Sequence, residues 1–465
     1  MANLTSDEIV KATGGELLSE NASSFPGVSI DSRNISEGEM FFALRGQKFD
    51  GHDFLEDALL KGGGAVIDSR QSPLPVGRVI IFVEDTLKAL QDLAHFLRTR
   101  QDIPVIAITG SNGKTTTKEM VYAILSSRFR TLKNEDNLNN NIGLPLSLTR
   151  LDPGDDVVVL ELGMNAGGEI RRLCEIAVPS HGVITNVGSA HIGMLGSLDS
   201  VRDAKLEILQ GLAVVVVNAD DSFLMEGYKS AVARSGFDGT LVTFSINNDA
   251  HVRAENVSVT ENGSNFTLMI EGGKKVLITL NINGFFNVYN ALAASAVCIS
   301  LGITPEEIKT ALESYSAFPS RFEVIRGDML TLINDSYNAN PSSMEEALKE
   351  LVRTGGGRRT VAVLGDMFEL GEFSESAHTA IGNIVSDLSI NVLITVGEMM
   401  NLAVEEIRRA GNQQPKKNLK VITYAFKTVD EARQNISDII REGDVVLIKG
   451  SRAMGMEQIL KGLKI

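Results

Sequence analysis

A glycine-rich turn that could bind phosphate lies in the sequence IAITGSNGKTTT, which begins at Ile106. Gly110 and Gly113 allow the backbone to turn tightly, so that several N–H groups converge at the start of the next helix. Lys114 would add a positive charge for the β and γ phosphates of a nucleotide, and Thr115 would offer its hydroxyl to Mg²⁺. These residue types in this order predict a nucleotide-binding loop.

The loop departs from the strict Walker pattern, because the glycine required five residues before Gly113 is replaced by Ile108. An ordinary strand-to-helix turn with a solvated lysine is the alternative. The order of strand, GxxGKT and helix favours the nucleotide site. The residues expected at the nucleotide are Gly110, Ser111, Asn112, Gly113, Lys114, Thr115 and Thr116.

A carboxylate that could hold the metal stands at Glu161, at the end of the apolar strand VVVLEL. In an open α/β sheet, ligands bind at the carboxyl ends of the strands. Glu161 and Thr115 together would offer oxygen ligands to the Mg²⁺ that neutralises the phosphates. Taken alone, a glutamate at a strand end could equally be solvated.

Two asparagines could recognise a nucleotide base. Asn287 and Asn290 lie three residues apart in the helix pattern FNVYNALAA, so they share one face. A carboxamide presents the donor and the acceptor that the N6/N7 edge of adenine requires. Near a helix start, either residue could instead be a cap.

The elements that position these residues fall into three α/β regions. Residues 1–102 form a small unit of short strands and turns, with a helix from about His52 to Leu60. Residues 103–317 contain apolar strands that alternate with helices, the pattern of a parallel, doubly wound sheet. Residues 318–465 show a Rossmann-like alternation through the strands TLINDS, TVAVLG, VLITVG, KVITYA and DVVLIKG. We therefore expect an α/β protein of three domains with these boundaries.

The middle region has a less regular end. Residues 250–282 lose the strand-helix rhythm and predict a β insert of antiparallel hairpins, with an NG and a GG turn. Helix 287–301 and the helix TPEEIKTALE close the region. Thr304 is the expected N-cap of the second helix, with Pro305 at its first position.

Composition excludes several classes of protein. Apolar residues make up 43% and charged residues 22%, as in soluble globular proteins. No signal-like run opens the chain, and no stretch approaches about 18 uninterrupted apolar residues. A net charge of −15 disfavours nucleic acid as a partner. We expect a cytoplasmic protein without membrane insertion, in which Cys174 and Cys298 are inert core thiols.

Six further motifs occur in order along nearly the whole chain. They are DNLNNNIGLP (136–145), ELGMNAGGEI (161–170), TNVGSAHIG with DAKLEIL downstream (185–209), GFFNVYNALAA (284–294), NDSYNANPSSMEEAL (334–348) and VLGDMFELG (363–371). Together with TGSNGKTTTKEM, they resemble the motifs of the Mur ligase family. The last two are similar to those of the Mur ligases that add D-alanyl-D-alanine.

The resemblance implies an ATP-dependent ligase that forms an amide through an acyl phosphate and releases ADP and phosphate. It assigns His191 to a second Mg²⁺. A cationic Lys205 beside two Mg²⁺ ions would be repelled, and similar ligases carry a carbamate on this lysine, which supplies oxygen ligands. A surface histidine and a solvated helix lysine are the alternatives.

The resemblance also implies which residues reach the nucleotide from the third domain. It assigns Arg321 to the γ-phosphate and Asp335 to the ribose when the domains close, and it favours adenine for Asn290 more than for Asn287. A surface ion pair is the alternative for the first two. Lys114 and Arg321 would then assist the phosphoryl transfer.

The implied substrates are UDP-N-acetylmuramoyl-tripeptide and D-alanyl-D-alanine, joined by a monomer during peptidoglycan precursor synthesis. The segment SIDSRNISEGEMFFALRGQKFDGHDF is similar to UDP-binding domains of Mur ligases. Its expected substrate contacts are Ser32, Arg33, Arg45, Gly46, Asp50 and His52. In KGSRAMGME, which follows a strand, Lys449, Ser451 and Arg452 could supply donors for the dipeptide.

Three other functions would each predict a different set of motifs. A Mur ligase that adds a diamino acid to UDP-muramoyl dipeptide would carry a DNPR box, where this chain has NDSYNANP. A folylpolyglutamate synthase would lack the UDP-type first domain. A non-catalytic nucleotide-binding protein would have lost Lys114, Glu161 or Lys205, and all three are present.

Overall fold

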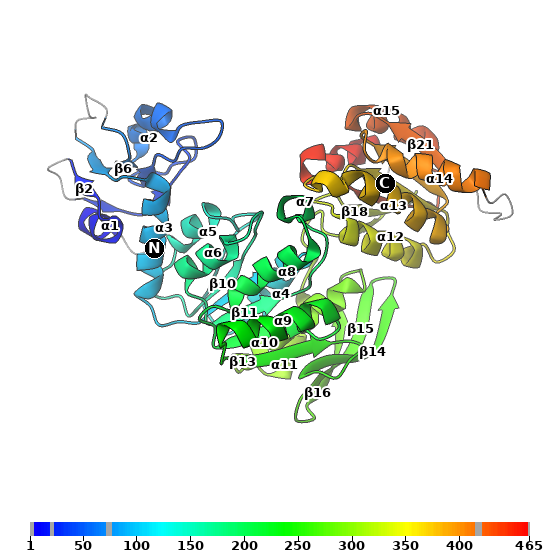
Figure 1. Ribbon diagram of the computed structural model, residues 1–465, viewed down its shortest axis with the longest axis horizontal. Helices are drawn as coiled ribbons and strands as arrows, with labels where there is room; N and C mark the ends of the chain where they lie inside the picture. Colours follow the sequence, from blue (N-terminus) through cyan, green and yellow to red (C-terminus); the bar gives the residue numbers. More distant parts are fainter. Residues whose placement is uncertain (1–3, 19–22, 71–76, 414–420, 464–465) are drawn as a thin grey trace.

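The computed structural model describes residues 4–18, 23–70, 77–413 and 421–463. Three α/β bodies follow one another along the molecule, and the N-terminal and C-terminal bodies lie on either side of the central one (Figure 1). Each body is built on its own main sheet. The predicted α/β fold, with a small N-terminal unit, a central doubly wound parallel sheet and a Rossmann-like C-terminal unit, is therefore confirmed.

The N-terminal body has a five-stranded sheet of order β2-β7-β6-β5-β4 and a small sheet of β1 and β3. Its strands are β1 Leu4–Thr5, β2 Glu16–Leu17, β3 Ser24–Phe25, β4 Val28–Ser29, β5 Met40–Phe42, β6 Gly64–Ile67 and β7 Val79–Phe82. Its helices are α1 Ser6–Thr13, the 3₁₀ turn Gly51–Phe54, α2 Leu55–Lys61 and α3 Thr86–Thr99. The predicted helix after His52 is thus a 3₁₀ turn that continues into α2.

Helix α3 joins the N-terminal body to the central one, where it packs against α5 and α6. Gln91 lies at this joint, because its Nε2 donates to the carbonyl of Asn141 at 2.9 Å. Its Oε1 accepts from the guanidinium of Arg172 at 2.9 Å. The joint therefore combines an apolar helix face with paired polar groups.

The central body has a nine-stranded sheet of order β16-β15-β14-β13-β12-β11-β8-β10-β9. Its strands are β8 Val105–Thr109, β9 Thr131–Lys133, β10 Val157–Glu161, β11 His181–Ile184, β12 Val214–Asn218, β13 Thr240–Ser245, β14 Val252–Thr260, β15 Gly263–Ile270 and β16 Lys275–Leu280. Its helices are α4 Lys114–Leu125, α5 Gly143–Leu148, α6 Glu169–Ala177, α7 Ile192–Leu195, α8 Leu198–Leu206, the 3₁₀ turn Glu207–Leu209, α9 Ser222–Ser235, α10 Phe286–Ser300 and α11 Pro305–Ser314.

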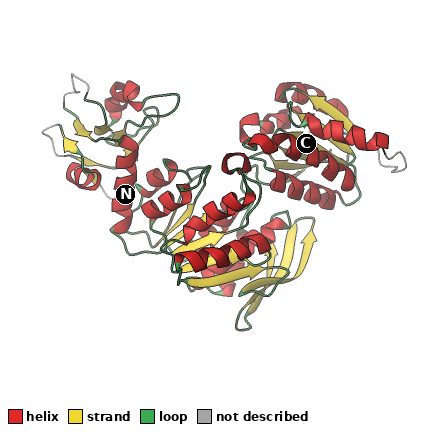
Figure 2. Ribbon diagram, in the orientation of Figure 1, coloured by secondary structure: helices red, strands yellow, loops and turns green. Residues whose placement is uncertain are grey.

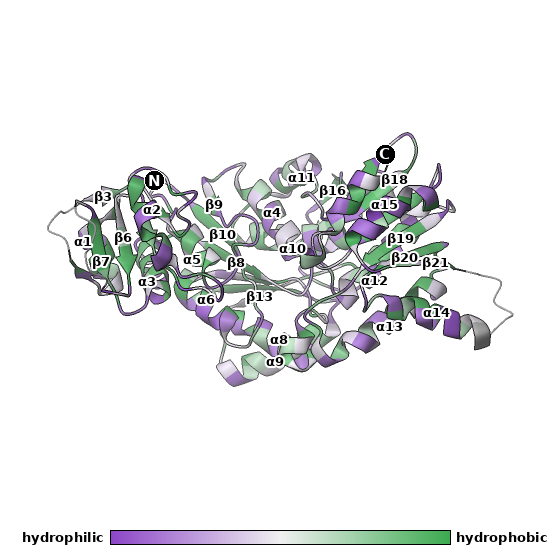
Figure 3. Ribbon diagram, turned by 90° about the horizontal axis from the view of Figure 1, so that it is seen from above, coloured by the Kyte–Doolittle hydropathy of each residue, from purple (hydrophilic) through white to green (hydrophobic). Residues whose placement is uncertain are grey.

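Apolar strand residues are buried on both faces of this sheet, as a parallel sheet requires. Ile106 and Ile108 of β8 belong to a core shared with α4, α10 and α11. Val105 and Ala107 belong to a second core, shared with α5, α6, α8 and α9. Figure 2 shows helices covering the central sheet, and Figure 3 shows the strands coloured as hydrophobic.

The antiparallel hairpins predicted for residues 250–282 are present as β14–β16. They extend the main sheet and do not form a separate insert. Strand β14 pairs parallel with β13, through Phe244 and Val252, and antiparallel with β15. Helix α11 covers the outer edge of β16, where Lys309 Nζ donates to the carbonyl of Leu277 at 2.7 Å. The edge strand is thus kept from pairing with another chain.

The predicted start of α11 is confirmed. The hydroxyl of Thr304 accepts from the N–H of Glu307, and Glu307 bonds back to the backbone of Thr304, with Pro305 at the first helical position. Both cysteines are buried and unpaired, and burial raises the pKa of Cys174 to about 12. Burial also raises the pKa of Cys298, so the reactive thiolate form is disfavoured at both cysteines.

The C-terminal body has a six-stranded sheet of order β17-β18-β22-β19-β20-β21, parallel except for β17. Its strands are β17 Glu323–Arg326, β18 Thr331–Asp335, β19 Thr360–Gly365, β20 Val392–Val396, β21 Ile422–Phe426 and β22 Val445–Lys449. Its helices are α12 Pro341–Gly355, α13 Ser374–Asp387, α14 Asn401–Gln413, α15 Val429–Ile439 and the 3₁₀ segments Gly371–Phe373, Arg452–Met454 and Met456–Gly462.

The predicted Rossmann-like alternation of the C-terminal region is confirmed, since α12–α15 connect parallel strands. Lys420, which begins the predicted strand KVITYA, lies outside the described residues. Among the helices that the structure describes, none combines the length and apolarity needed to cross a bilayer. The domain boundaries at 102/103 and 317/318 stay a prediction.

Candidate active site

A cavity of about 1230 Å³ lies between the central and C-terminal bodies. The phosphate loop and the carboxyl ends of β10, β11 and β12 line its central side. The segments that follow β18, β19 and β22 line its C-terminal side. Since ligands of open α/β sheets bind at the carboxyl ends of strands, this cavity is the candidate active site.

The phosphate loop connects β8 to α4, and two of its residues must be glycine. A Cβ on Gly110 would lie 1.9 Å from Thr185 Oγ1, and a Cβ on Gly113 would lie 2.2 Å from Asn290 Oδ1. Both glycines also have positive φ, at 151° and 80°. The loop therefore turns as tightly as its sequence predicts.

Lys114 is the first residue of α4, and its side chain turns back over the loop. Its Nζ donates to the carbonyl of Gly110 at 2.8 Å and to that of Ser111 at 3.4 Å. Burial lowers the pKa of Lys114, while the nearby carboxylate of Glu161 opposes this shift. A lysine side chain held against this loop is suited to a bound phosphate.

Glu161 lies directly beside the loop, as predicted. Its Oε2 accepts from the hydroxyl of Thr115 at 2.8 Å, and its Oε1 accepts from Asn139 Nδ2 at 2.8 Å. The carboxylate is 3% exposed and belongs to a strand end at the cavity. A carboxylate and a hydroxyl oxygen side by side form a donor set that Mg²⁺ prefers.

Lys205 is buried in α8 with only 1% of its surface exposed. Burial, together with the positive charge of Lys114, lowers its pKa well below the usual value. A lowered pKa favours the neutral form of the amine, which is the nucleophilic form.

His191 lies at the edge of the cavity and faces the C-terminal body. Its Nδ1 lies 2.8 Å from Glu369 Oε2, and this contact is the largest cause of the lowered pKa of Glu369. His191 adopts a left-handed backbone, with φ 60°. In residues 4–18, 23–70, 77–413 and 421–463, no three side chains of His, Cys, Asp or Glu gather as a metal cluster. The role of His191 at a second Mg²⁺ stays a prediction.

Asn287 and Asn290 share one face of α10, as predicted, and are both buried. Asn290 Nδ2 donates to Asn287 Oδ1 at 2.9 Å, and Asn287 Nδ2 donates to the carbonyl of Asn283 at 2.7 Å. Asn290 also lines the cavity beside Gly113. Of the pair, Asn290 is the better placed to contact a nucleotide, and neither acts as a helix cap.

Arg321 comes from the C-terminal body and reaches the phosphate loop. Its Nη2 donates to Thr115 Oγ1 at 2.9 Å, and its guanidinium lies 3.8 Å from the ring centre of Tyr337. Its Nε is buried and finds no partner among the described residues. An unsatisfied donor beside the loop leaves a hydrogen bond for an anion.

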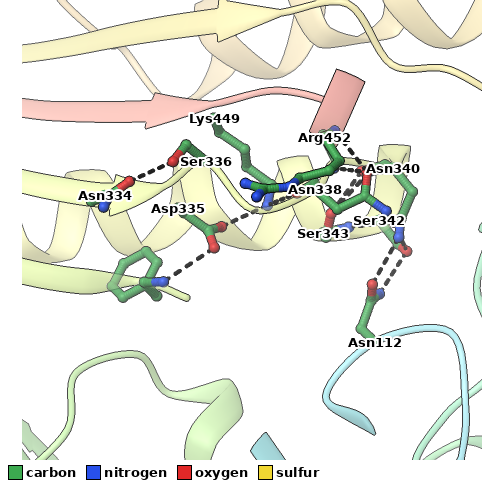
Figure 4. Close-up of polar contacts among 12 residues, drawn as sticks. Asn112, Asn334, Asp335, Ser336, Asn338, Asn340, Ser342, Ser343, Lys449 and Arg452 are labelled. Atoms are coloured by element: carbon green, nitrogen blue, oxygen red, sulfur yellow. Dashed lines mark hydrogen bonds and ion pairs between the residues drawn. The ribbon is translucent and has the colours of Figure 1, made fainter. Parts of the chain in front are cut away.

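Asp335 and Lys449 form a partly buried ion pair at the ends of neighbouring strands. Lys449 Nζ lies 2.6 Å from Asp335 Oδ2 and donates to the carbonyl of Asn338 at 3.0 Å (Figure 4). The N–H of Phe322 donates to Asp335 Oδ1. The predicted ribose and dipeptide residues therefore touch each other.

Ser451 and Arg452 follow β22 at the cavity. The hydroxyl of Ser451 accepts from the N–H of Phe368 at 2.8 Å, so it organises the loop after β19. The guanidinium of Arg452 lies 5.4 Å from the ring centre of Tyr337. Of the predicted dipeptide donors, Arg452 is exposed, whereas Lys449 forms an ion pair with Asp335.

The predicted UDP contacts lie in the N-terminal body and do not line this cavity. Arg45 pairs with Asp68 at 2.8 Å and also with Asp50, whose Oδ1 lies 2.6 Å from His52 Nδ1. His52 Nε2 accepts from the N–H of Asp68, which leaves the ring proton on Nδ1. Arg45, Asp50 and His52, from the segment between β5 and α2, thus form one cluster with Asp68, which directly follows β6.

Two of the other predicted UDP contacts lie in the turn after β4, and the third lies beside Arg45. Arg33 pairs with Asp31 at 2.7 Å and lowers the pKa of that carboxyl to about 2, while Ser32 lies between them. The N–H of Gly46 donates to the carbonyl of Phe49 in a tight turn. Their role in binding UDP stays a prediction.

Known proteins match the chain in all three bodies. Residues 24–98 match the catalytic domain of the Mur ligase family, residues 108–298 the Mur ligase middle domain, and residues 320–452 the Mur ligase glutamate ligase domain. A UDP-N-acetylmuramoyl-tripeptide--D-alanyl-D-alanine ligase of Bacillus subtilis is 36% identical and is aligned over 94% of this chain and 93% of its own length. The chain belongs to the Mur ligase family.

Other Mur ligases are similar to this chain over all or nearly all of its length. The Escherichia coli protein of the same name is 34% identical and is aligned over 100% of this chain and 99% of its own. A crystal structure of MurF from Acinetobacter baumannii superposes with a TM-score of 0.89 at 30% identity, covering 99% of this chain and 98% of the other. MurF ligase from Thermotoga maritima, solved in complex with ADP, has a TM-score of 0.79 at 26% identity and covers 94% and 96%.

Several site residues of this Mur ligase were not predicted from the sequence. Asn139 bonds to Glu161, Asn340 and Ser342 bond to the phosphate loop, and Glu369 pairs with His191. All four lie inside motifs that carried the family resemblance. The motifs pointed to these segments, but no local pattern says which side chain crosses from one body to another.

Proposed function

We propose that this Mur ligase joins D-alanyl-D-alanine to UDP-N-acetylmuramoyl-tripeptide and converts ATP to ADP and phosphate. The relatives from Bacillus subtilis and Escherichia coli bear the name of this activity over nearly the whole chain. The geometry that carries the proposal is the contact of Arg321 with Thr115, at 2.9 Å, in one cavity. It brings the body proposed to bind the amine against the loop proposed to bind ATP.

The reaction has two steps at this cavity. A carboxylate oxygen of the tripeptide attacks the γ-phosphorus of ATP, the bond to the β-phosphate oxygen breaks, and an acyl phosphate and ADP result. The amine of D-alanyl-D-alanine then attacks the acyl carbon, loses a proton, and expels phosphate as the amide forms. Lys114 and Arg321 stabilise the charge that builds up on the transferred phosphoryl group.

Thr115 and Glu161 are the residues that would hold Mg²⁺, which would neutralise charge on the ATP phosphates. The 2.8 Å pairing of a hydroxyl with a nearly buried carboxylate supports this assignment. His191 would serve a second ion from the edge of the cavity. His191 already faces Glu369 of the C-terminal body. When the bodies are closed, both side chains would therefore lie at the position of this second ion.

Lys205 is proposed to carry a carbamate. Its neutral Nζ attacks carbon dioxide, an N–C bond forms, and one proton is lost, so an amine becomes an anionic group with two oxygens. The burial of Lys205 supports this step, because burial lowers its pKa and so favours the unprotonated amine. An anionic group can serve as a metal ligand where an ammonium cannot.

The nucleotide contacts follow from the cavity lining. We assign adenine to Asn290, with Asn287 holding its amide in place through the 2.9 Å bond. We assign the ribose to Asp335, whose charge is stabilised by Lys449. The lining residues Ser111, Asn112, Gly113, Lys114, Thr115 and Thr116, together with Gly110 at the start of the loop, would surround the phosphates.

Each of the three domains has its own role in this reaction. The N-terminal domain, residues 1–102, binds UDP through the cluster around Arg45 and through the turn at Ser32 and Arg33. The central domain, 103–317, binds ATP, and the C-terminal domain, 318–465, binds the dipeptide near Ser451 and Arg452. The boundaries are supported by α3 ending at Thr99 and α11 at Ser314. We place the enzyme in the cytoplasm, as a monomer that acts in cell-wall synthesis and division.

One assay tests the function. Purified enzyme receives ATP, Mg²⁺ and either UDP-muramoyl tripeptide or UDP-muramoyl dipeptide, with D-alanyl-D-alanine, D-alanine, L-lysine or diaminopimelate, and phosphate release is measured. We expect D-alanyl-D-alanine to support turnover and the single amino acids to fail. Faster release with a diamino acid on UDP-muramoyl dipeptide would overturn the assignment in favour of the diamino-acid-adding Mur ligases.

A further inference from the structure

Asn112 of the phosphate loop is held by two different bodies of the molecule. The central body holds its backbone: the N–H of Asn112 donates to Asn186 Oδ1 at 3.0 Å, and its carbonyl accepts from Thr185 Oγ1 at 2.6 Å. Asn186 Nδ2 also donates to that carbonyl, at 3.1 Å. The peptide of Asn112 is therefore fixed to the segment that follows β11.

The C-terminal body holds the side chain of Asn112 (Figure 4). Asn112 Nδ2 donates to Ser342 Oγ at 2.9 Å, and Asn340 Nδ2 donates to Asn112 Oδ1 at 2.9 Å. The hydroxyl of Ser342 donates to Asn340 Oδ1, also at 2.9 Å. The three side chains close a ring in which both ends of the Asn112 amide are satisfied from α12.

The same junction is too tight for a larger residue at Gly188. A Cβ there would lie 2.7 Å from Ser342 Oγ and 3.3 Å from Ser342 Cβ. Gly188 is not one of the glycines with positive φ in the described part of the chain, so its backbone conformation does not itself require glycine. Its lack of a side chain is explained by the approach of α12.

We propose that Asn112 is a positioning residue that couples the seating of the C-terminal domain on the central domain to the conformation of the phosphate loop. Asn112 stands between Gly110 and Gly113, both at positive φ, so release of its side chain removes the C-terminal body's hold on a loop whose glycines permit other conformations. Two ordinary hydrogen bonds correspond to a bias of about tenfold to thirtyfold toward the ordered loop.

The coupling gives the reaction an order, and this part of the inference rests on the proposed function. The loop is ordered for phosphate only while the domain that brings the amine is seated against it. The acyl phosphate then forms in a site that is already closed to water. A passive contact between domains would add stability but would not alter the loop.

The first test compares two neighbouring serines of α12. Ser342→Ala removes the acceptor for Asn112, whereas Ser343→Ala removes a hydroxyl that bonds only to the backbone of Asn340. Hydrogen exchange of residues 110–114 is measured in the nucleotide-free protein. We expect about fivefold to tenfold faster exchange in Ser342→Ala and less than twofold change in Ser343→Ala. Equal exchange in the two variants would overturn the coupling.

The second test uses Gly188→Ala, alone and with Ser342→Ala. We expect Gly188→Ala to speed loop exchange and to lower kcat, and the double variant to be no worse than the more affected single variant, since both act on one junction. Additive effects would overturn the proposal. Exchange is read without substrate, so a wild-type enzyme inactive on tripeptide and dipeptide would refute the proposed function and leave the coupling to be judged by exchange alone.

Discussion

At the scale of single residues, the side chain of Lys114 should contribute little to the stability of the fold. Its ammonium bonds to two carbonyls of its own loop, so Lys114→Ala should change the free energy of unfolding by about 1 kcal/mol. Phosphoryl transfer should fall at least about a hundredfold, because the charge on the transferred group loses its cation. Turnover and thermal unfolding of the same preparation measure the two effects. Turnover within tenfold of wild type would contradict the role of the loop.

Lys205 is the second prediction at this scale. Lys205→Ala should be inactive, and short carboxylic acids such as acetate should partly restore turnover, because they refill the position of the carbamate. Intact-mass measurement under bicarbonate should show the carbamate on wild type and not on the variant. A bare amine on wild type with bicarbonate and Mg²⁺ present would refute the modification, whatever the activity of the variant.

At the scale of elements, Asn134 fixes the end of β10 beside the loop after β9. Its Oδ1 accepts from the N–H of Glu161 at 2.9 Å, and its Nδ2 donates to the carbonyl of Glu161 at 3.0 Å. Lys118 Nζ, which is fully buried, donates to the carbonyl of Asn134. The amide therefore completes the pairing that a further strand residue would otherwise supply.

Asn134→Ala should lower the free energy of unfolding by about 3 kcal/mol, because it leaves buried backbone groups of Glu161 without partners. Activity should fall as well, since Glu161 loses its fixed position. Urea unfolding measures the stability. The control is Asn137→Ala, an exposed residue of the same loop, which should stay within about 0.5 kcal/mol of wild type. Equal stability of the two variants would show that Asn134 does not anchor β10.

At the scale of the whole molecule, helix α7 of the central body seats the C-terminal body. Ile192 packs against the C-terminal core, and the N–H of Gly193 donates to the carbonyl of Glu369 at 3.2 Å. A Cβ on Gly193 would lie 2.2 Å from the carbonyl carbon of Leu370. Because the obstructing atom belongs to the backbone, it cannot move aside as a side chain would.

Gly193→Ala should therefore open the molecule. We expect a larger radius of gyration in small-angle scattering and at least about a tenfold loss of kcat, with ADP binding retained by the central domain. Met194→Ala, on the exposed side of the same helix, is the control and should match wild type. An unchanged radius of gyration in Gly193→Ala would refute the seating role of α7.

Much of the molecule follows from patterns within a few residues of the chain. The start of α4 after two glycines, the Thr304 cap with Pro305, and the alternation of apolar strands with helices are all local, and the structure confirms them. The position of Glu161 beside Thr115 also follows, because neighbouring parallel strands end at one edge. Such features depend on backbone sterics, capping and periodicity, which act over short distances.

Tertiary structure alone decided the pairings between distant segments. Asn112 meets Asn340 across 228 residues, and Lys449 meets Asp335 across 114. The expected β insert became the edge of the main sheet, since β14 found a parallel partner in β13. The same local sequence patterns are compatible with many different contacts between distant residues. Sheet order and the docking of one body on another determine which of these contacts form. The sequence by itself determined the family, the elements and the loop, and packing determined which side chains complete the site.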